Sequence, residues 1–445
     1  MLKNMTFSFI SLGCAKNLVD SEEIMGNLIR EGCRLAPQIA DSDFVVINTC
    51  AFLHEARREA FEIIKEMGKI KRSPKNKLSK IVVAGCLVQY FTPHEIKAKI
   101  PEADLFVPVK QYRLLPRLLE SVFFPRIHTV KSPALPSNSR FLSRSPHSVY
   151  IKIADGCDNR CSYCLIPFLR GKLRSKSIDD IISEVHGVQK LGAREIILIA
   201  QDITAYGLDL YGKFMLGELL RRLCKIKDIK WIRLLYLHPA HITDDLLNVV
   251  QQEPKICKYL DLPIQHINNK ILRLMGRKTS REEIIFLYNK VRALMPEVVL
   301  RTTVMTGFPG EGEEEFAELL TFLRKYPFER LGAFSFSPER GAAAFELPSR
   351  VKKETAVQRW RKIMEQQKVI SRSFNRSLLG QEVEVLVDAY SRERKSARGR
   401  MISQAPEVDG QVIIGRASAV KPGDFLRVKI TGVGTYDLMG EKMNL

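Results

Sequence analysis

The sequence predicts an α/β protein in three parts. These are an N-terminal parallel sheet with helices on its faces, a partial (β/α)6 barrel, and a small C-terminal antiparallel β-barrel. Three observations predict this fold class. Short apolar runs alternate with amphipathic stretches up to residue 124, and a longer series of such units starts at residue 149. After residue 373, segments that alternate apolar and polar residues are separated by glycines.

Length and composition are those of a soluble globular protein. The chain has 445 residues, of which 45% are hydrophobic and 27% charged. The opening residues make a poor signal peptide, and no apolar run reaches the roughly 18 residues of a membrane span. We therefore expect a cytoplasmic protein with no membrane partner. Nine cysteines in that compartment indicate metal or redox chemistry in place of disulfides.

The chain is strongly basic, with a net charge of +20. Such an excess favours a phosphate-rich partner such as RNA or a ribonucleoprotein, and a basic enzyme without such a partner is the alternative. Residues 375–445 hold 11 basic and 9 acidic side chains, so nearly all of the excess lies before them. The C-terminal part is therefore not the obvious electrostatic anchor for RNA.

Residues 1–124 alternate strand and helix candidates, which predicts a flavodoxin-like parallel sheet. The strand candidates are 7–14, 43–50, 80–86 and 105–109. Asp20, followed by Glu23, is a candidate helix start, and Thr92 with Glu95 forms a second capping pattern.

Each of the first three strand candidates ends in a cysteine: Cys14, Cys50 and Cys86, spaced by 36 residues. Because parallel strands end at one edge of the sheet, the three thiols are expected to meet there. Buried structural cysteines are the alternative, since Cys is small and apolar. Three in succession at the same place in their units favour a metal site.

The remaining boundaries follow from composition and periodicity. Residues 125–148 contain four prolines and six serines and are expected to be a linker. Six strand–helix units occupy 149–346, fewer than the eight of a complete barrel. A basic amphipathic helix is expected over 347–373, and a small β-barrel over 374–445.

The stretch GCDNRCSYC places Cys157, Cys161 and Cys164 within eight positions after the first barrel strand. A structural zinc site usually takes four ligands from two paired knuckles, whereas Cys224 and Cys257 stand alone. Three thiolates on a 4Fe–4S cluster would leave one iron open to a small molecule.

This motif in this position resembles that of the radical S-adenosylmethionine enzymes. The resemblance implies that the open iron binds S-adenosylmethionine, whose reductive cleavage gives a radical that abstracts hydrogen. It implies that Tyr163 lies against the adenine and that TGFPGE, with Gly307, Pro309 and Gly310, lines the cofactor pocket. Gln265 and His266 end the fourth barrel strand and are candidates for the same pocket, although a lone histidine is as often structural.

Essentially the whole chain resembles the methylthiotransferases, and the C-terminal part resembles the TRAM domain. The resemblance implies that Cys14, Cys50 and Cys86 hold a second 4Fe–4S cluster facing the same cavity. It also implies that one S-adenosylmethionine supplies a methyl group, a second supplies the radical, and a flavodoxin-like or ferredoxin-like protein donates electrons. No catalytic residue beyond the cluster ligands is predicted.

The segments 11–22, 233–242 and 259–277 resemble the RimO type of this family. That resemblance implies an aspartate of a small-subunit ribosomal protein (protein twelve) as substrate and the ribosomal subunit as partner, with contact to ribosomal RNA left open. Residues 335–345 depart from the pattern, because the expected Glu-Glu-Gly-Thr run is missing. A tRNA adenosine methylthiotransferase (MiaB-like) and a non-catalytic iron–sulfur protein are the alternatives.

Overall fold

The computed structural model describes residues 2–124 and 140–443, which form two compact units. The first unit contains the described residues up to 144, together with 155–158 and 165–173, and the second contains the rest. Most of the predicted linker, 125–139, lies outside the described residues. The predicted domain boundaries remain predictions.

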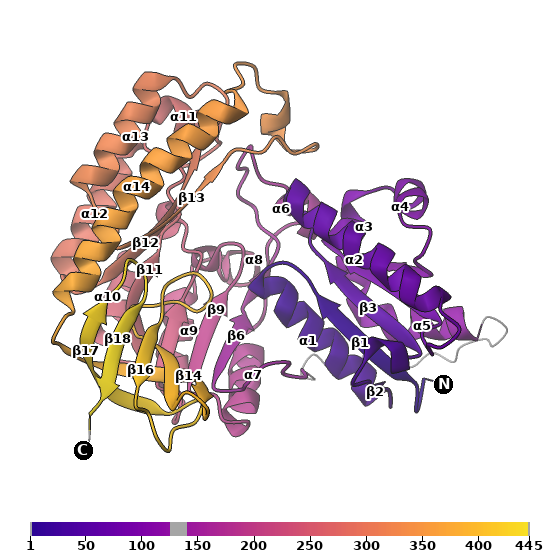
Figure 1. Ribbon diagram of the computed structural model, residues 1–445. Helices are drawn as coiled ribbons and strands as arrows, with labels where there is room; N and C mark the ends of the chain where they lie inside the picture. Colours follow the sequence, from indigo (N-terminus) through magenta and orange to yellow (C-terminus); the bar gives the residue numbers. More distant parts are fainter. Residues whose placement is uncertain (1, 125–139, 444–445) are drawn as a thin grey trace. The chain divides into compact units, whose positions relative to one another are not determined.

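The first unit is built on a five-stranded parallel sheet in the order β2-β1-β3-β4-β5 (Figure 1). Its strands are β1 (Thr6–Ser11), β2 (Arg34–Leu35), β3 (Phe44–Thr49), β4 (Lys80–Gly85) and β5 (Leu105–Val107). Every residue of β3 is buried. The central strand is apolar on both faces because helices cover both faces of a parallel sheet.

Helices connect these strands. They are α1 (Ala15–Arg30), α2 (His54–Arg72), α3 (Cys86–Tyr90), α4 (Pro93–Lys99), α5 (Leu115–Phe123) and α6 (Ile166–Arg170), with 3-10 turns η1 (Ile39–Asp41) and η2 (Val109–Leu114). Ile24 and Leu28 of α1 and Leu119 of α5 share one buried cluster with Phe44 and Val82 of the sheet. Both helices therefore pack on the same face.

One predicted helix start is wrong and another is confirmed. Helix α1 begins at Ala15 with Cys14 as its N-cap, whereas the sequence pattern placed the start at Asp20. Asp20 is buried and pairs with Arg170, so its carboxylate serves an ion pair instead of a cap. At α4 the expected reciprocal hydrogen bonds between Thr92 and Glu95 are present.

The second unit contains a six-stranded, wholly parallel sheet in the order β13-β12-β11-β10-β9-β6. Its strands are β6 (Ser148–Lys152), β9 (Glu195–Ile199), β10 (Trp231–Leu234), β11 (Ile256–Asp261), β12 (Val299–Thr306) and β13 (Arg330–Ser335). Six parallel strands alternating with helices confirm the predicted partial (β/α)6 barrel.

Helices separate and follow the barrel strands. They are α7 (Ile178–Lys190), α8 (Leu208–Tyr211), α9 (Leu216–Cys224), α10 (Asp244–Gln252), α11 (Asn269–Leu274), α12 (Arg281–Leu294), α13 (Glu313–Lys325) and α14 (Lys353–Ser377); the short segments are β7 (Ala154–Asp155), β8 (Arg174–Ser175), η3 (Ile203–Ala205), η4 (Pro239–His241) and η5 (Ala343–Glu346). Helix α14 lies along β13, where Trp360 Nε1 donates to the Ala333 carbonyl at 2.8 Å. Among the described residues, no helix combines the length and apolar character needed to cross a membrane.

The C-terminal strands close into a barrel in the order β14-β15-β16-β18-β17, which confirms the predicted small β-barrel. They are β14 (Glu382–Ser391), β15 (Ser396–Met401), β16 (Val412–Gly415), β17 (Phe425–Val433) and β18 (Leu438–Lys442). All neighbouring pairs are antiparallel except β16 and β18. Strands β14 and β17 carry the predicted alternation of apolar and polar residues, whereas β15 and β18 are interrupted by Gly399 and Gly440.

Candidate functional site

The N-terminal cysteines lie at the carboxyl ends of three adjacent parallel strands. Cys14 caps α1 three residues after β1, Cys50 directly follows β3, and Cys86 begins α3 directly after β4. The thiols interact electrostatically, since Cys14 acts on both Cys50 and Cys86. Cys14 is exposed, Cys50 partly buried and Cys86 buried.

Two glycines allow this close approach. A Cβ on Gly13 (φ +94) would lie 2.7 Å from Cβ of Cys50, and one on Gly85 (φ +106) would lie 2.5 Å from the Thr49 carbonyl oxygen. Any larger residue at either position would push the cysteine-bearing turns apart. The backbone is therefore shaped to gather the three side chains.

A buried arginine supplies positive charge beside these thiols. Burial raises the pKa of Cys86 to about 12, and the charge of Arg170 acts in the opposite direction. Nη1 of Arg170 lies 2.8 Å from Asp20 and 3.2 Å from Asp155, and Nη2 donates to Asn17. Three converging thiols beside a guanidinium fit a site that binds iron through thiolates.

The second cysteine motif lies on the loop Gly156–Cys164. Cys157 belongs to the first unit, where its N–H donates to the Gly171 carbonyl at 3.1 Å. Cys161 and Cys164 belong to the second unit and are joined by a turn, with Cys164 N donating to the Cys161 carbonyl at 3.0 Å. Arg277 Nη1 lies 3.9 Å from Cys161 Sγ.

The residues expected to contact S-adenosylmethionine are found in three different surroundings. Tyr163 packs against a buried cluster that includes Phe308, and Cys161 and Cys164 act on its hydroxyl. Pro309 and Gly310 line a pocket of about 530 Å³. Gly307 (φ +74) faces α14, where a Cβ would lie 2.3 Å from Cβ of Ala356.

Gln265 and His266 differ in character. His266 Nδ1 accepts from Asn268 N at 3.0 Å, and Nε2 lies 3.6 Å from Glu311, with both side chains fully buried. This arrangement supports a structural role for His266. Gln265 has a positive φ of 68° and a buried Oε1 without a hydrogen-bond partner among the described residues, as is common for strained residues beside functional sites.

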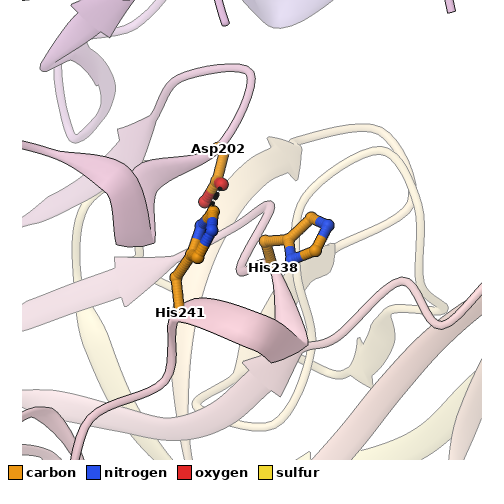
Figure 2. Close-up of side chains that lie close together, drawn as sticks. All are labelled: Asp202, His238 and His241. Atoms are coloured by element: carbon orange, nitrogen blue, oxygen red, sulfur yellow. Dashed lines mark hydrogen bonds and ion pairs between the residues drawn. The ribbon is translucent and has the colours of Figure 1, made fainter. Parts of the chain in front are cut away.

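The structure adds three side chains that the sequence analysis did not single out: Asp202, His238 and His241 (Figure 2). Asp202 follows β9, and the two histidines follow β10, so all three lie at the carboxyl edge of the barrel, where (β/α) proteins carry their chemistry. The available signal was polar residues directly after two successive apolar strands.

A hydrogen bond joins Asp202 to His241, and the ring of His238 stacks on that of His241. Asp202 Oδ2 accepts from His241 Nδ1 and from Asn159 Nδ2, each at 2.8 Å, and Oδ1 accepts from the N–H and hydroxyl of Thr204. Burial alone would raise the pKa of Asp202, but the hydrogen bonds that it accepts, above all the one from His241, lower it to about 2. Asp202 is therefore an ionised carboxylate, each of whose oxygens already accepts two hydrogen bonds.

Three family models match successive parts of the chain. Residues 6–108 match the uncharacterized protein family UPF0004, residues 151–323 match the radical SAM superfamily, and residues 379–443 match the TRAM domain. The radical SAM match implies S-adenosylmethionine and a 4Fe–4S cluster for this chain. The order of the three matches follows the order of the two sheets and the closed barrel.

Curated relatives match over nearly the full length. Proteins named ribosomal protein uS12 methylthiotransferase RimO are 43% identical in Caldicellulosiruptor saccharolyticus, covering 97% of this chain and 98% of the relative, and 42% identical in Carboxydothermus hydrogenoformans, covering 99% and 100%. The chain belongs to the RimO family. The RimO-type resemblance of its segments is thereby confirmed, and with it the class of methylthio-group transferases.

Solved structures support the fold of this RimO-family chain. The radical S-adenosylmethionine methyltransferase TsrM from Kitasatospora setae superposes with a TM-score of 0.55 at 14% identity, covering 75% of this chain and 72% of that chain. The cobalamin-dependent S-adenosylmethionine radical enzyme OxsB gives 0.53 at 13% identity, covering 83% and 56%. At such identities the likeness concerns the fold alone.

Proposed function

We propose that this chain adds a methylthio group to the β-carbon of an aspartate in ribosomal protein uS12, using two 4Fe–4S clusters. Cys157, Cys161 and Cys164 hold the cluster that binds S-adenosylmethionine, and the N-terminal trio holds the other. The observation that carries the proposal is the convergence of Cys14, Cys50 and Cys86 at one sheet edge in a RimO-family chain.

The donor set of the N-terminal trio supports a cluster with one open iron. Three thiols interact there, and Gly13 and Gly85 allow the turns that carry them to approach one another closely. Arg170 favours the thiolate form that binds iron. Cys33, the fourth cysteine within residues 2–124, does not compete, because it is buried elsewhere and its pKa is raised to about 11 by burial.

When bound, S-adenosylmethionine would supply both the methyl group and the radical that takes a hydrogen atom from the β-carbon, and the cluster held by the N-terminal trio would supply the sulfur that carries the methyl group to that carbon. The protein holds the reactants in place. The turn through Cys161 and Cys164 is seated by Ser162 N, which donates to Met275 O at 2.9 Å, and Arg277 contacts Cys161. An electron comes from a flavodoxin-like or ferredoxin-like donor.

Iron analysis of anaerobically purified protein tests the two clusters. We expect about eight irons and eight sulfides per chain, and about four of each after C50A or C161A substitution. The matched control is C224A, because Cys224 lies on α9 outside both motifs. About four irons in the wild-type protein would contradict the N-terminal cluster.

Mass spectrometry of a deletion strain tests the substrate. We expect uS12 to lose the mass of one methylthio group while the methylthio-adenosines of tRNA remain. If the deletion instead removes the methylthio group from tRNA and leaves the mass of uS12 unchanged, the tRNA alternative is supported. Restoration of the uS12 modification by the wild-type chain, but not by C161A, completes the assignment.

A further inference from the structure

A backbone hydrogen bond fixes the tautomer of His238, whose ring lies beside Asp202 and His241 in Figure 2. The backbone N–H of Ala240 donates to His238 Nδ1 at 3.2 Å, so Nδ1 is an acceptor and the proton of the neutral ring is on Nε2. Burial, together with the charges of Arg277 and Lys278, lowers the pKa of His238 to about 3. His238 is therefore a neutral donor through Nε2 across the physiological range.

This donor is open to a ligand. Among the described residues Nε2 of His238 has no hydrogen-bond partner, and it is not one of the fully enclosed polar atoms. The ring itself is held firmly, with 8% of the residue exposed and the His241 ring stacked on it at a centroid distance of 4.8 Å and an angle of 27°. A polar hydrogen held in place but left unused is typical of a recognition site.

A metal ion is a poor occupant of this cluster, although one ligand atom from each of the three residues lies within 4.8 Å of the others. Both oxygens of Asp202 already accept two hydrogen bonds each, and Nδ1 of His238 and of His241 is also occupied. A cation would have to displace these donors. The network is better suited to orient side chains than to coordinate an ion.

The surroundings of His238 favour an anion. Arg277 and Lys278 act on His238 as positive charges. The carboxylate of Asp202 acts on it in the opposite sense, but both of its oxygens already accept hydrogen bonds from neighbouring donors. The site also adjoins the loop that carries Asn159 and Cys161, because Arg277 contacts Cys161 and Asn159 donates to Asp202. An anion bound here would lie beside the loop that carries the proposed cluster ligand Cys161.

We propose that His238 donates a hydrogen bond from Nε2 to the side-chain carboxylate of the substrate aspartate, with Arg277 and Lys278 supplying the positive field and Asp202 and His241 acting as positioning residues. This inference rests on the proposed function. The carboxylate of an aspartate is bonded directly to the β-carbon. A hydrogen bond to that carboxylate therefore positions the reacting carbon, which is one bond away.

Titration calorimetry of purified uS12 with the holoenzyme tests the assignment by measuring how tightly the two bind. Wild-type enzyme is compared with H238L and H238Q, and uS12 with a variant whose target aspartate is asparagine. Loss of a hydrogen bond to a charged group should weaken binding roughly ten- to hundredfold in H238L. H238Q, whose amide donates from nearly the same position, should stay within about threefold of wild type.

The double-mutant cycle decides between recognition and general damage. We expect the aspartate-to-asparagine change to weaken binding to the wild type but to have little further effect on H238L. Iron content is measured for every variant, and the control H186L should match the wild type in iron content, in substrate-free cleavage of S-adenosylmethionine and in uS12 binding, because His186 is exposed on α7. KM for uS12 should rise in H238L more than kcat falls.

Tight binding of uS12 by H238L, or additive effects of the two substitutions, would overturn the inference while methylthio transfer by the wild type persists. If H238L binds less iron than the wild type, H238Q decides the question. An H238Q protein with full iron content but a KM for uS12 as high as that of H238L would also overturn the inference. Absence of methylthio transfer by the wild-type enzyme would overturn the proposed function instead, so the two failures are distinguishable.

Discussion

Arg170 shows how one buried residue can serve both stability and chemistry. Its guanidinium is 2% exposed and interacts with two carboxylates, one amide and the thiols of Cys50 and Cys86. Such a residue is retained only where its partners are also buried, because either partner alone would carry a large desolvation cost. The charge that favours iron binding is therefore also part of the core of the first unit.

Replacing Arg170 should destabilise the first unit strongly. R170M leaves the carboxylates of Asp20 and Asp155 without their counter-charge, so we expect a loss of about 3–5 kcal/mol in the free energy of unfolding. Hydrogen exchange of the β3 and β4 amides measures it. The double variant R170M/D20N should be less destabilised than R170M; a larger loss would contradict a charge-based origin.

At this scale the sequence predicts some site residues and misses others. The N-terminal cysteines stand out because their spacing repeats, and the other three because they are clustered; cysteine is rare enough for either pattern to carry information. His238 and Asp202 do not stand out, because they are brought together by the pairing of β9 with β10 and not by any local spacing. A lone histidine after an apolar strand is compatible with too many roles to be assigned from sequence.

At the scale of the element, the N-terminal site depends on how each strand ends. Parallel strands deliver their last residues to one edge, but the chain must then turn away sharply enough to leave a side chain pointing out. Gly85 provides that turn between β4 and α3, in a conformation that L-residues rarely adopt. Strand order could be predicted from the alternation of elements, whereas this turn geometry could not.

G85A should cost more than a positive φ alone can explain. Its Cβ would lie 2.5 Å from the Thr49 carbonyl and 2.6 Å from Asn48 Oδ1, which adds a clash to the backbone strain. Gly192 (φ +102) is a matched control, because a Cβ there would meet nothing within 4 Å. We expect G192A to lose about 1–2 kcal/mol and G85A clearly more, as measured by chemical denaturation. Equal losses would argue against the clash.

At the scale of the whole molecule, the second unit is held together by contacts that no sequence pattern shows. The periodicity of apolar residues predicts the barrel strands and most of the closed β-barrel, because each has its own buried face. It does not predict that Glu195, the first residue of β9, is fully buried between Arg233 and Arg400. Arg400 lies on β15, 205 positions away, so this ion-pair network joins the radical barrel to the C-terminal barrel.

This network should make stability depend on pH. Burial alone would raise the pKa of Glu195, but Arg400 and Arg233 lower it to about 2. Because the pKa is depressed on folding, the stabilisation is fully present above the unfolded value of about 4.3 and is lost as the pH falls from there toward 2. E195Q should lower the free energy of unfolding at pH 7 by about 3–5 kcal/mol, since it leaves two buried guanidinium groups beside a neutral amide.

Chemical denaturation of wild type and E195Q at pH 7, 5 and 4 measures this dependence. The difference in the free energy of unfolding between the two proteins should be constant from pH 7 to about 5 and then begin to shrink. Below that pH Glu195 is protonated in the unfolded wild-type chain but stays ionised in the folded chain. E218Q is the control: Glu218 is half-exposed and pairs with Arg221 at 3.8 Å, so its loss should change stability little at any pH. A difference that stays constant down to pH 4 would mean that Glu195 contributes through packing and not through its charge.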